Sequence, residues 1–423
     1  MLNSFLRGYY TPSFYKLVVN TSFDLTDLNE LENQPRPFST FFHEYLHFIQ
    51  DISTSFGLMN ALIILNQIKY SNNYILKGKT SFKIPISFDK NSDFKLAEEM
   101  RIIYMGPVQM RNYKKIVSVT KKESSTFIPT HNKYLEKIVV SIEIDNDISE
   151  VDFGGLSIIE SMAHIAQKHF YPETQHNDIP YKFANQIAEF LYPEFVKNSL
   201  YIFALCDACL MTYHPGLTFY EVLTGLKKDQ IIPKTEEEIY DLVYSNVLGN
   251  GESIIELYKN INDSAKKELT HYFTTNIHEN EKKWIEVILE RIQEKRVSSP
   301  TFLLDILKQE KANSILFKKL ILEIGSPLIE NILGDNHMFV PRGFENIEIK
   351  IDVFSSINEI FKLFTQGNKS CQLVNFCKSS IIGDITDGRC TESPWLRCND
   401  KNLCGYAVLW KMWGLNNYEP ILN

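Results

Sequence analysis

The sequence contains no long run of lysine and arginine, and its 52 acidic residues outnumber its 44 basic ones, which leaves a formal net charge of −8. Proteins that bind nucleic acid usually carry a basic patch interleaved with aromatic side chains. The composition therefore argues against DNA or RNA as a partner. The chain also lacks internal repeats and low-complexity tracts, which excludes solenoid and linker-rich architectures.

Long apolar segments are missing as well. The first 20 residues mix charged, polar and apolar side chains and contain no continuous apolar stretch of the kind found in a secretory signal. The longest apolar span, residues 200–213, contains Asp207 and is followed by Pro215, so it is too short and too interrupted to cross a bilayer. We therefore expect a cytoplasmic protein that does not bind membranes.

What the chain does have is enough apolar content for a large core, since 44% of its 423 residues are hydrophobic. The patterns predict an α+β fold that is mostly helical. A polar stretch at residues 227–238 and a stretch rich in Gly, Pro and Asn at residues 334–346 indicate boundaries. We predict three units, which span residues 1–228, 229–335 and 336–423.

The first unit is expected to combine helices with a small antiparallel sheet. A helix is predicted from just after Pro37 to Gly57, with Ser39 as its N-cap. β-Branched or alternating segments predict the strands of the sheet. The further expected elements are helices at residues 58–74, 94–105 and 156–170 and strands at residues 81–88, 115–120 and 137–144.

The strongest motif lies at residues 40–49, where His43 and His47 are four positions apart and Glu44 follows the first histidine. This spacing places both imidazoles on one face of a helix, where they can bind the same Zn²⁺ ion. Glu44 can then accept a proton from a water polarised by the metal and pass it to the leaving amine. By chance the pattern His-Glu-x-x-His would occur roughly 0.02 times in such a chain, so two unrelated histidines on an ordinary helix are the weaker interpretation.

At these residues the chain resembles the zincin metallopeptidases, in which threonine or an uncharged residue, here Thr40, stands three positions before the first histidine and apolar residues flank the second. The resemblance implies a zincin-like catalytic core, a zinc cofactor and a peptide or protein substrate. The metzincin branch would require glycine at position 50 and histidine at position 53, where this chain has Gln50 and Ser53. The gluzincin branch is therefore the better match.

Gluzincins take a third zinc ligand from a glutamate on a second helix, and the resemblance implies Glu160 for this role. Glu160 lies among apolar residues, where a carboxylate needs a partner. It follows His47 by 113 positions, a longer gap than gluzincins usually show. His164, one turn further on the same face, is an alternative ligand or a group that supports the ligands or the transition state. Ordinary structural roles for both residues remain open.

Two further residues were assigned supporting roles. Asp207 is the single carboxylate of an apolar segment, and we expect it to accept the free ring N–H of a zinc-bound histidine, with a distant salt bridge as the alternative. His214 ends the same segment and is a candidate for stabilising the oxyanion that forms during hydrolysis. The spacing does not separate it from His176, Tyr171 or Tyr213, and a helix end explains it equally well.

Seven cysteines are unevenly distributed, and five of them fall within 34 residues near the C-terminus. In a reducing compartment such a group indicates metal binding more than disulfides. No Cys-x-x-Cys pair occurs among these five, so structural zinc, an iron–sulfur cluster and independent free thiols all remain open. The candidate ligands of this second metal site are Cys371, Cys377, Cys390, Cys398 and Cys404.

These features together predict a zinc-dependent peptidase. The Gly-x-Met-Glu-Asn signature of aminopeptidases is missing, which favours an endopeptidase whose substrate strand pairs with an edge of the inserted sheet. The alternative is a non-catalytic, metal-containing regulatory or binding protein built on a zincin-like scaffold. A redox or metal sensor based on the C-terminal cysteines is a third interpretation. The oligomeric state and the specific substrate are left open by the sequence.

Overall fold

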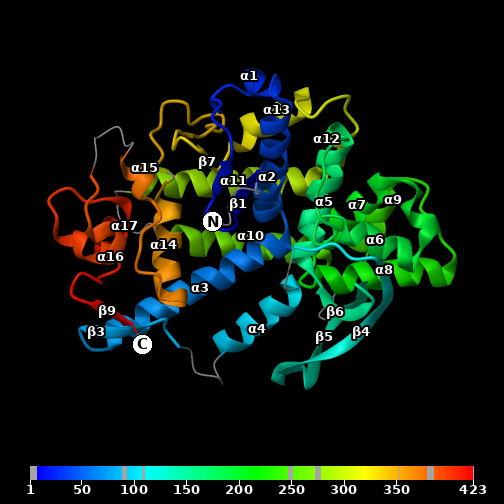
Figure 1. Ribbon diagram of the computed structural model, residues 1–423, viewed down its shortest axis with the longest axis horizontal. Coiled ribbons are helices and arrows are strands. Elements are labelled where there is room, and N and C mark those ends of the chain that lie inside the picture. Colours follow the sequence, from blue (N-terminus) through cyan, green and yellow to red (C-terminus); the bar gives the residue numbers. More distant parts are fainter. Residues whose placement is uncertain are drawn as a thin grey trace.

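The computed structural model describes residues 7–87, 93–106, 110–245, 251–271, 278–350, 352–378 and 385–422. Helices dominate, and the strands form small sheets, which confirms the predicted α+β class. In Figure 1 the helices formed by residues 183–244 lie at one end of the molecule, and the C-terminal cysteine-containing segments lie at the other. The helices that carry the predicted metal ligands are between them.

The helix with the His-Glu-x-x-His motif is α2 (Pro35–Ser53), which follows α1 (Leu28–Glu32). It begins at Pro35 because the first helical turn leaves N–H groups unpaired, so a proline is tolerated there. Ser39 therefore lies inside the helix, and its predicted role as N-cap is wrong. Every residue of α2 from Phe38 onward is buried, so the motif belongs to the core of the protein.

A sharp bend separates α2 from α3 (Ser55–Lys77). Thr54 caps α3, since its hydroxyl accepts the N–H of Gly57 at 3.0 Å. A side chain at Gly57 would lie 2.3 Å from the carbonyl oxygen of Asp51, so only glycine allows this close approach. Among the described helices none is long and apolar enough by itself to span a membrane, although α2 and α3 taken together pass that test despite a bend of 76°.

A mixed four-stranded sheet packs beside α2 and has the order β1-β2-β7-β8. β1 and β2 form an antiparallel hairpin, whereas β2 and β7 are parallel although about 310 residues separate them. β1 lies at the edge of this sheet. The strands are β1 (Gly8–Thr11), β2 (Lys16–Val19), β7 (Leu328–Asn331) and β8 (Asn336–His337).

The inserted sheet contains β4 (Lys115–Ile128), β5 (Lys133–Ile144) and β6 (Asp147–Phe153) in consecutive antiparallel order. It extends from one side of the molecule (Figure 1). The predicted pairing of the second and third strands is confirmed, but the sequence analysis missed β6. The first predicted strand corresponds to β3 (Ser81–Ile84), which pairs in parallel with β9 (Glu419–Leu422) instead, so its assignment to this sheet is wrong. Phe88, at the end of that prediction, lies outside the described residues.

The remaining elements are helices, of which α4 and α5 lie where the periodicity predicts them. They are α4 (Asp93–Met105), η1 (Pro129–His131), α5 (Gly155–Phe170), α6 (Phe183–Leu191), η2 (Pro193–Lys197), α7 (Ser199–Cys209), α8 (Pro215–Asp229), α9 (Glu236–Tyr244), α10 (Ile254–His271), α11 (Glu279–Ser298), α12 (Phe302–Leu307), α13 (Ile315–Ile324), α14 (Asp352–Gln366), α15 (Val374–Lys378), α16 (Arg389–Glu392), η4 (Pro394–Asn399) and α17 (Gly405–Met412).

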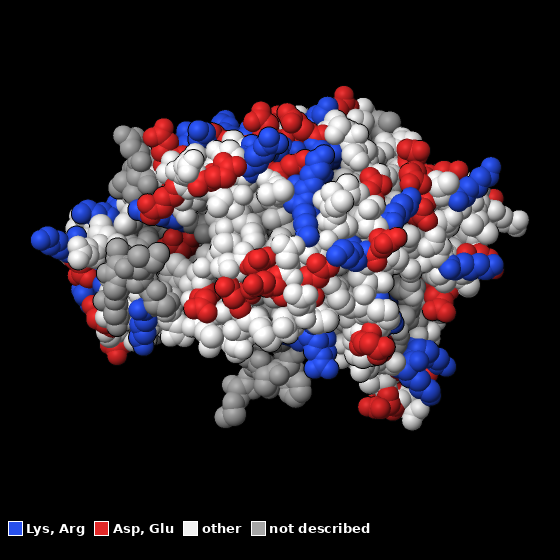
Figure 2. Space-filling view, turned by 90° about the horizontal axis from the view of Figure 1, so that it is seen from above, with Lys and Arg blue, Asp and Glu red and all other residues white. Residues whose placement is uncertain are grey.

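Packing joins the three predicted units. The β2–β7 pair links the first unit to the second, and the β3–β9 pair links the first to the third. One cluster of buried apolar side chains runs through all three, because helices such as α11 and α14 pack against the N-terminal elements. On the face shown in Figure 2, acidic and basic side chains are interspersed, so that face carries no extended basic surface.

Candidate metal centre

The two motif histidines point at the same place. Helix α2 places their imidazoles one turn apart, and the Nε2 atoms of His43 and His47 are 3.1 Å from each other. Their side chains are almost completely buried, with exposed fractions of 4% and 8%. Such close approach of two ring nitrogens in an apolar interior requires a shared proton or a shared cation.

Glu160 completes the group from a second helix. It lies on α5, which packs against α2. Its Oε2 atom is 3.4 Å from Nε2 of His43 and 3.3 Å from Nε2 of His47. These three residues are the group of His, Cys, Asp or Glu side chains, within the described part of the chain, that could hold a metal ion. The structure thus brings together the three ligands that the resemblance implies.

The spacing of the three donor atoms fits a small, tetrahedrally coordinated ion. An ion with ligand bonds of about 2.0–2.1 Å places neighbouring ligand atoms about 3.3 Å apart. The observed separations are 3.1, 3.3 and 3.4 Å. Three protein ligands leave one position of a tetrahedron for a water molecule or a substrate, which is the arrangement of catalytic rather than structural sites.

Charge in this group is mutually compensated. Burial by itself would raise the pKa of Glu160, but the charges and hydrogen bonds of His47 and His43 hold it well below its usual range. Burial would lower the pKa of His47, whereas the carboxylate of Glu160 raises it to about 9. A negatively charged Glu160 therefore faces the two imidazoles, and a metal ion that binds here has to displace the proton that this carboxylate stabilises on His47.

Gln50 orients one of the two histidines. Its side-chain oxygen accepts the Nδ1–H of His47 at 2.8 Å, which leaves Nε2 of that ring as the donor to the metal. Its amide nitrogen donates to the carbonyl oxygen of Ile159 at 3.2 Å and so connects α2 to α5 next to Glu160. From the sequence alone, Gln50 serves only to exclude one family branch. A polar residue three positions after a ligand, on a buried helix, was the feature that could have revealed this role.

Glu44 lies beside His43, His47 and Glu160, which we call the triad, without belonging to it. It is 7% exposed and lines a cavity of about 310 Å³ together with His43, His176 and Tyr181. Burial raises its pKa, the charges of His43 and His47 oppose that rise, and the backbone N–H of Tyr10 donates to its carboxylate. A carboxylate beside an open coordination position, with a raised pKa, is suited to accept a proton.

His164 contributes no donor atom to the triad. Its Nδ1 lies 3.1 Å from Nδ1 of His176, and the ring of His176 stacks on Tyr181 with centroids 4.2 Å apart. His176 in turn contacts His43 at a centroid distance of 5.6 Å. His164 therefore supports His176, and the alternative in which it replaces Glu160 as a ligand is wrong. Spacing in the sequence does not distinguish His176 from His214, Tyr171 or Tyr213, and no sequence pattern indicates Tyr181.

Asp207 does not reach the metal centre. Its two oxygens accept from the guanidinium of Arg296 at 2.8 and 3.0 Å, and the hydroxyl of Tyr240 donates to it at 2.9 Å. Arg296 also donates to the carbonyl oxygen of Ser53, the last residue of α2, at 3.1 Å. The predicted bond from Asp207 to a metal-binding histidine is wrong, and the distant salt bridge is correct. A buried carboxylate takes the strongest donor within reach, which here is an arginine from α11.

His214 is an N-cap rather than a catalytic group. Its Nε2–H donates to the carbonyl oxygen of Glu136 at 2.9 Å, and its Nδ1 accepts the N–H of Leu217 at the start of α8. Both ring nitrogens are thus occupied away from the triad. The predicted role of His214 in stabilising an oxyanion is wrong because its ring is held by a strand carbonyl at the start of α8, which packs against β5 of the inserted sheet.

This environment predicts a pH effect on stability. Burial lowers the pKa of His214 from 6.5 to about 4, so as the pH falls below 6.5 the unfolded chain takes up a proton that the folded chain refuses. Stability that is present above pH 6.5 is lost toward pH 4. Between pH 7.5 and pH 5, wild type should lose about 2 kcal/mol more unfolding free energy than a His214→Asn variant, which keeps a capping side chain. Urea unfolding at both pH values measures this, and parallel losses in the two proteins would contradict it.

Four of the five C-terminal cysteines belong to the segments around α15, α16 and α17, which lie together at one end of the molecule (Figure 1), and all five are free thiols. Among the described residues, no three of their sulfurs come within 4.8 Å of one another. Cys398 lies in η4 next to Arg397, and burial raises its pKa without a contribution from another cysteine. Cys206 and Cys209 are buried in α7 as core residues.

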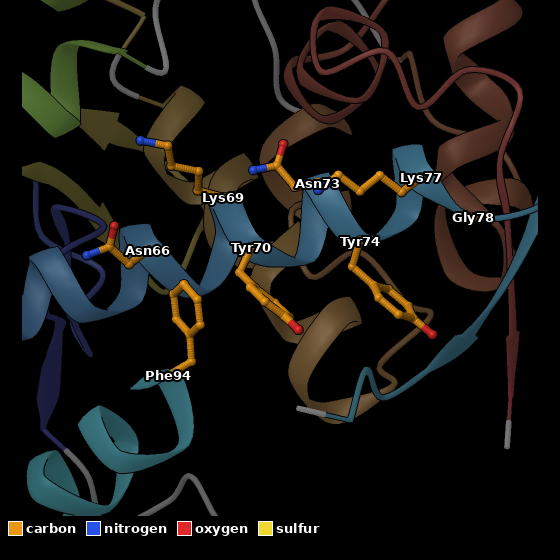
Figure 3. Close-up of a pocket in the computed structure, with 8 residues that line it drawn as sticks. All are labelled: Asn66, Lys69, Tyr70, Asn73, Tyr74, Lys77, Gly78 and Phe94. Carbon is orange, nitrogen blue, oxygen red and sulfur yellow. The ribbon is translucent and has the colours of Figure 1, made fainter. Parts of the chain in front are cut away.

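A larger cavity lies away from the triad. It has a volume of about 600 Å³ and runs along the outer face of α3, where Lys69, Tyr70, Asn73 and Tyr74 line it (Figure 3). Phe94 of α4 packs against Tyr70 with ring centroids 4.5 Å apart. None of its lining residues is a histidine, cysteine, aspartate or glutamate, so this groove offers no group for metal binding or acid–base chemistry at neutral pH.

No known protein-family model matches this chain, and no curated protein and no solved structure is significantly similar to it. A functional interpretation therefore depends on the geometry of the site.

Proposed function

We propose that the protein is a zinc-dependent endopeptidase, with His43, His47 and Glu160 as the zinc ligands and Glu44 as the general base. The observation that carries this proposal is the set of three donor atoms 3.1–3.4 Å apart, with a non-ligating carboxylate on the same helix face. Two histidines and one glutamate with a fourth position left free are the ligands of one established class of catalytic zinc sites. A zinc ion bound there supplies a Lewis acid and makes a water molecule acidic near neutral pH.

Glu44 has two tasks in this reaction. It takes the proton from the attacking water, and it then delivers that proton to the nitrogen of the leaving amine. Its burial supports both tasks, because the raised pKa makes it a stronger base than an exposed carboxylate. The hydrogen bond from the N–H of Tyr10 fixes its position beside His43.

His176 and Tyr181 are suited to hold the carbonyl oxygen of the substrate as it gains negative charge. They line the cavity next to His43 and Glu44. Burial lowers the pKa of His176 to about 4 and raises that of Tyr181 above its ordinary value, so at neutral pH the imidazole is uncharged and the phenol keeps its proton. Both groups can therefore donate hydrogen bonds to an oxyanion.

An extended peptide fits the edge of β1. Within the described residues β1 pairs with β2 alone, and the bond from the N–H of Asn20 to the carbonyl of Arg7 makes residues 7, 9 and 11 face β2. The backbone of Gly8 then points outward, next to Glu44. A side chain at Gly8 would lie 2.7 Å from Cγ2 of Thr40, so glycine is required there. A substrate strand that adds to β1 would reach the triad. We therefore expect β1, rather than an edge of the inserted sheet, to bind the substrate.

Removal and return of the metal test this proposal. The purified protein should contain one zinc ion per chain and cleave internal bonds in a library of fluorescence-quenched peptides. Treatment with 1,10-phenanthroline should abolish cleavage, and added zinc should restore it. Glu160→Gln should bind zinc at least about 10-fold more weakly, whereas Glu173→Gln, an exposed residue beyond α5, should behave as wild type.

Two outcomes would overturn the proposal. One is a protein that binds no metal at the triad, shown by equal zinc content in wild type and in Glu160→Gln. The other is a protein that binds zinc at the triad but cleaves no peptide or protein and instead forms a stoichiometric complex, which would favour a regulatory or binding role on the same scaffold.

A further inference from the structure

The C-terminal cysteines carry a second site that the peptidase reaction does not use. Four of them come from separate segments: Cys371 follows α14, Cys377 lies in α15, Cys390 in α16, and Cys404 caps α17. In Figure 1 these helices form one group at the end of the molecule. The backbone N–H of Cys371 donates to the carbonyl of Cys390 at 2.8 Å. Below, 'the thiol group' means the set of these four cysteine side chains, not a single –SH.

The segments that carry these side chains pack together, because α14 and η4 both pack against α17 and α16 packs against η4. Burial, with smaller contributions from Cys404 and Cys390, raises the pKa of Cys377 to about 12. Burial likewise raises the pKa of Cys371 to about 12, with contributions from Glu359, Cys377 and Cys404, and Cys390 adds to the raised pKa of Cys404. These effects agree with the backbone bond between Cys371 and Cys390 in placing the four side chains in one group.

A buried cation faces the thiol group. Arg397 is 6% exposed, and its Nη1 donates to Sγ of Cys390 at 3.1 Å. Its ion-pair partner, Asp400, is at 3.3 Å and also binds Arg389 through both oxygens. A neutral thiol is a weak acceptor and does little to offset the desolvation of a guanidinium. A set of metal-bound thiolates, which carries net negative charge, would compensate Arg397 directly.

The buried hydroxyl of Tyr406 also indicates that a hydrogen-bond acceptor binds at the cysteines. Tyr406, in the first turn of α17, is 2% exposed, and its OH has no hydrogen-bond partner among the described residues. Burial raises its pKa well above the ordinary value, and Cys371 and Cys404 add to the rise, which places the phenol beside the thiol group. Buried hydroxyls are rarely left unsatisfied, because losing the hydrogen bonds of water costs about 1–3 kcal/mol. An acceptor at the thiol group would satisfy it.

The described sulfurs are too far apart for a single tetrahedral ion. One tetrahedral ion with metal–sulfur bonds of about 2.3 Å needs its sulfurs about 3.8 Å apart. In the described part of the chain no three cysteine sulfurs are within 4.8 Å of one another. In an iron–sulfur cluster the cysteines are shared among two or four iron atoms, so no three of them bind one iron, and as a set they stand farther apart than the ligands of a single ion.

We propose that Cys371, Cys377, Cys390 and Cys404 hold an iron–sulfur cluster, with Arg397 and Tyr406 as hydrogen-bond donors to its sulfurs. Cys398 is excluded from the ligand set, although it lies in the same stretch of sequence. Since α14 already packs against α17, and η4 packs against both α16 and α17, a cluster would fasten these segments and α15 to one another more tightly.

The full chain, purified without oxygen from cells supplied with iron, tests this. We expect iron and acid-labile sulfide in equal amounts, either two or four of each per chain, with a broad visible absorbance band. Cys377→Ser and Cys404→Ser should each lose at least about 80% of the iron and sulfide. Cys398→Ser is the matched control and should keep both. Because a ligand variant could fail to fold, zinc at the His43 site and circular dichroism are measured on every protein.

Three results would overturn the proposal. Wild type that contains neither iron nor sulfide, before and after reconstitution with ferrous iron and sulfide, would show that no cluster binds. Zinc in place of iron at the cysteines would show a single-ion site. Equal iron loss in Cys398→Ser and Cys377→Ser would show that the ligand set is different.

Discussion

Glu44→Gln is expected to lower kcat/KM for peptide hydrolysis by about 10³- to 10⁴-fold while zinc remains bound at one ion per chain. The amide has nearly the shape of the carboxylate but cannot accept the proton of the attacking water. Zinc binding should be unchanged because the three donor atoms belong to His43, His47 and Glu160. Steady-state kinetics on a fluorescence-quenched peptide, with zinc measured by mass spectrometry on the same sample, separate the two effects.

Glu30→Gln is the matched control for this experiment. Glu30 is an exposed carboxylate in α1, so the same chemical change there should leave kcat/KM within about twofold of wild type. If Glu44→Gln cleaved peptides at the wild-type rate, Glu44 would not be the base. If the variant lost both zinc and activity, Glu44 would be acting as a ligand, and the assignment of Glu160 would have to be revised.

Asp207→Ala should reduce the free energy of unfolding by about 3–5 kcal/mol. Both members of the Asp207–Arg296 pair are fully buried, and removing the carboxylate leaves a guanidinium without a counter-charge in the core. The hydroxyl of Tyr240 loses its acceptor at the same time. The measurement is urea unfolding followed by tryptophan fluorescence, since Trp284 lies on α11 together with Arg296.

Two variants show whether the lost charge is the cause. Glu237→Ala removes a carboxylate from a half-exposed pair with Lys308 and should cost no more than about 1 kcal/mol. A double variant, Asp207→Leu with Arg296→Met, removes both charges and should be more stable than Asp207→Ala by at least about 1 kcal/mol. A loss below about 1 kcal/mol in Asp207→Ala itself would mean that water or another residue compensates Arg296.

The incorrect predictions have a common physical origin, which is the long-range choice of hydrogen-bond partners. Asp207 was assigned to a metal-binding histidine because its apolar neighbours require a partner, and that requirement was correct. The partner, Arg296, is 89 positions away on α11, and nothing in local spacing connects the two. His214 was likewise expected at the metal centre, but its ring is held by a strand carbonyl of Glu136. A polar residue reveals its need for a partner in the sequence, but not which partner it has.

The assignment of strands to sheets was limited by the same dependence on long-range packing. The alternation in residues 115–144 predicted two strands that do pair, because a short connection favours an antiparallel hairpin. Residues 81–84 have a similar pattern, but they pair with the far C-terminus. Parallel pairing between such distant segments depends on how the intervening helices pack, and this is not encoded in the pattern of a single strand.

The sequence by itself determined the part of the metal centre that lies on one helix. His43, Glu44 and His47 share a face because backbone hydrogen bonding sets 3.6 residues per turn wherever a helix forms. Only the tertiary structure decided that Glu160 rather than His164 meets them, that Gln50 orients His47, and that four of the five C-terminal cysteines gather. These arrangements depend on how helices pack through long-range burial of apolar surface, which no local spacing specifies.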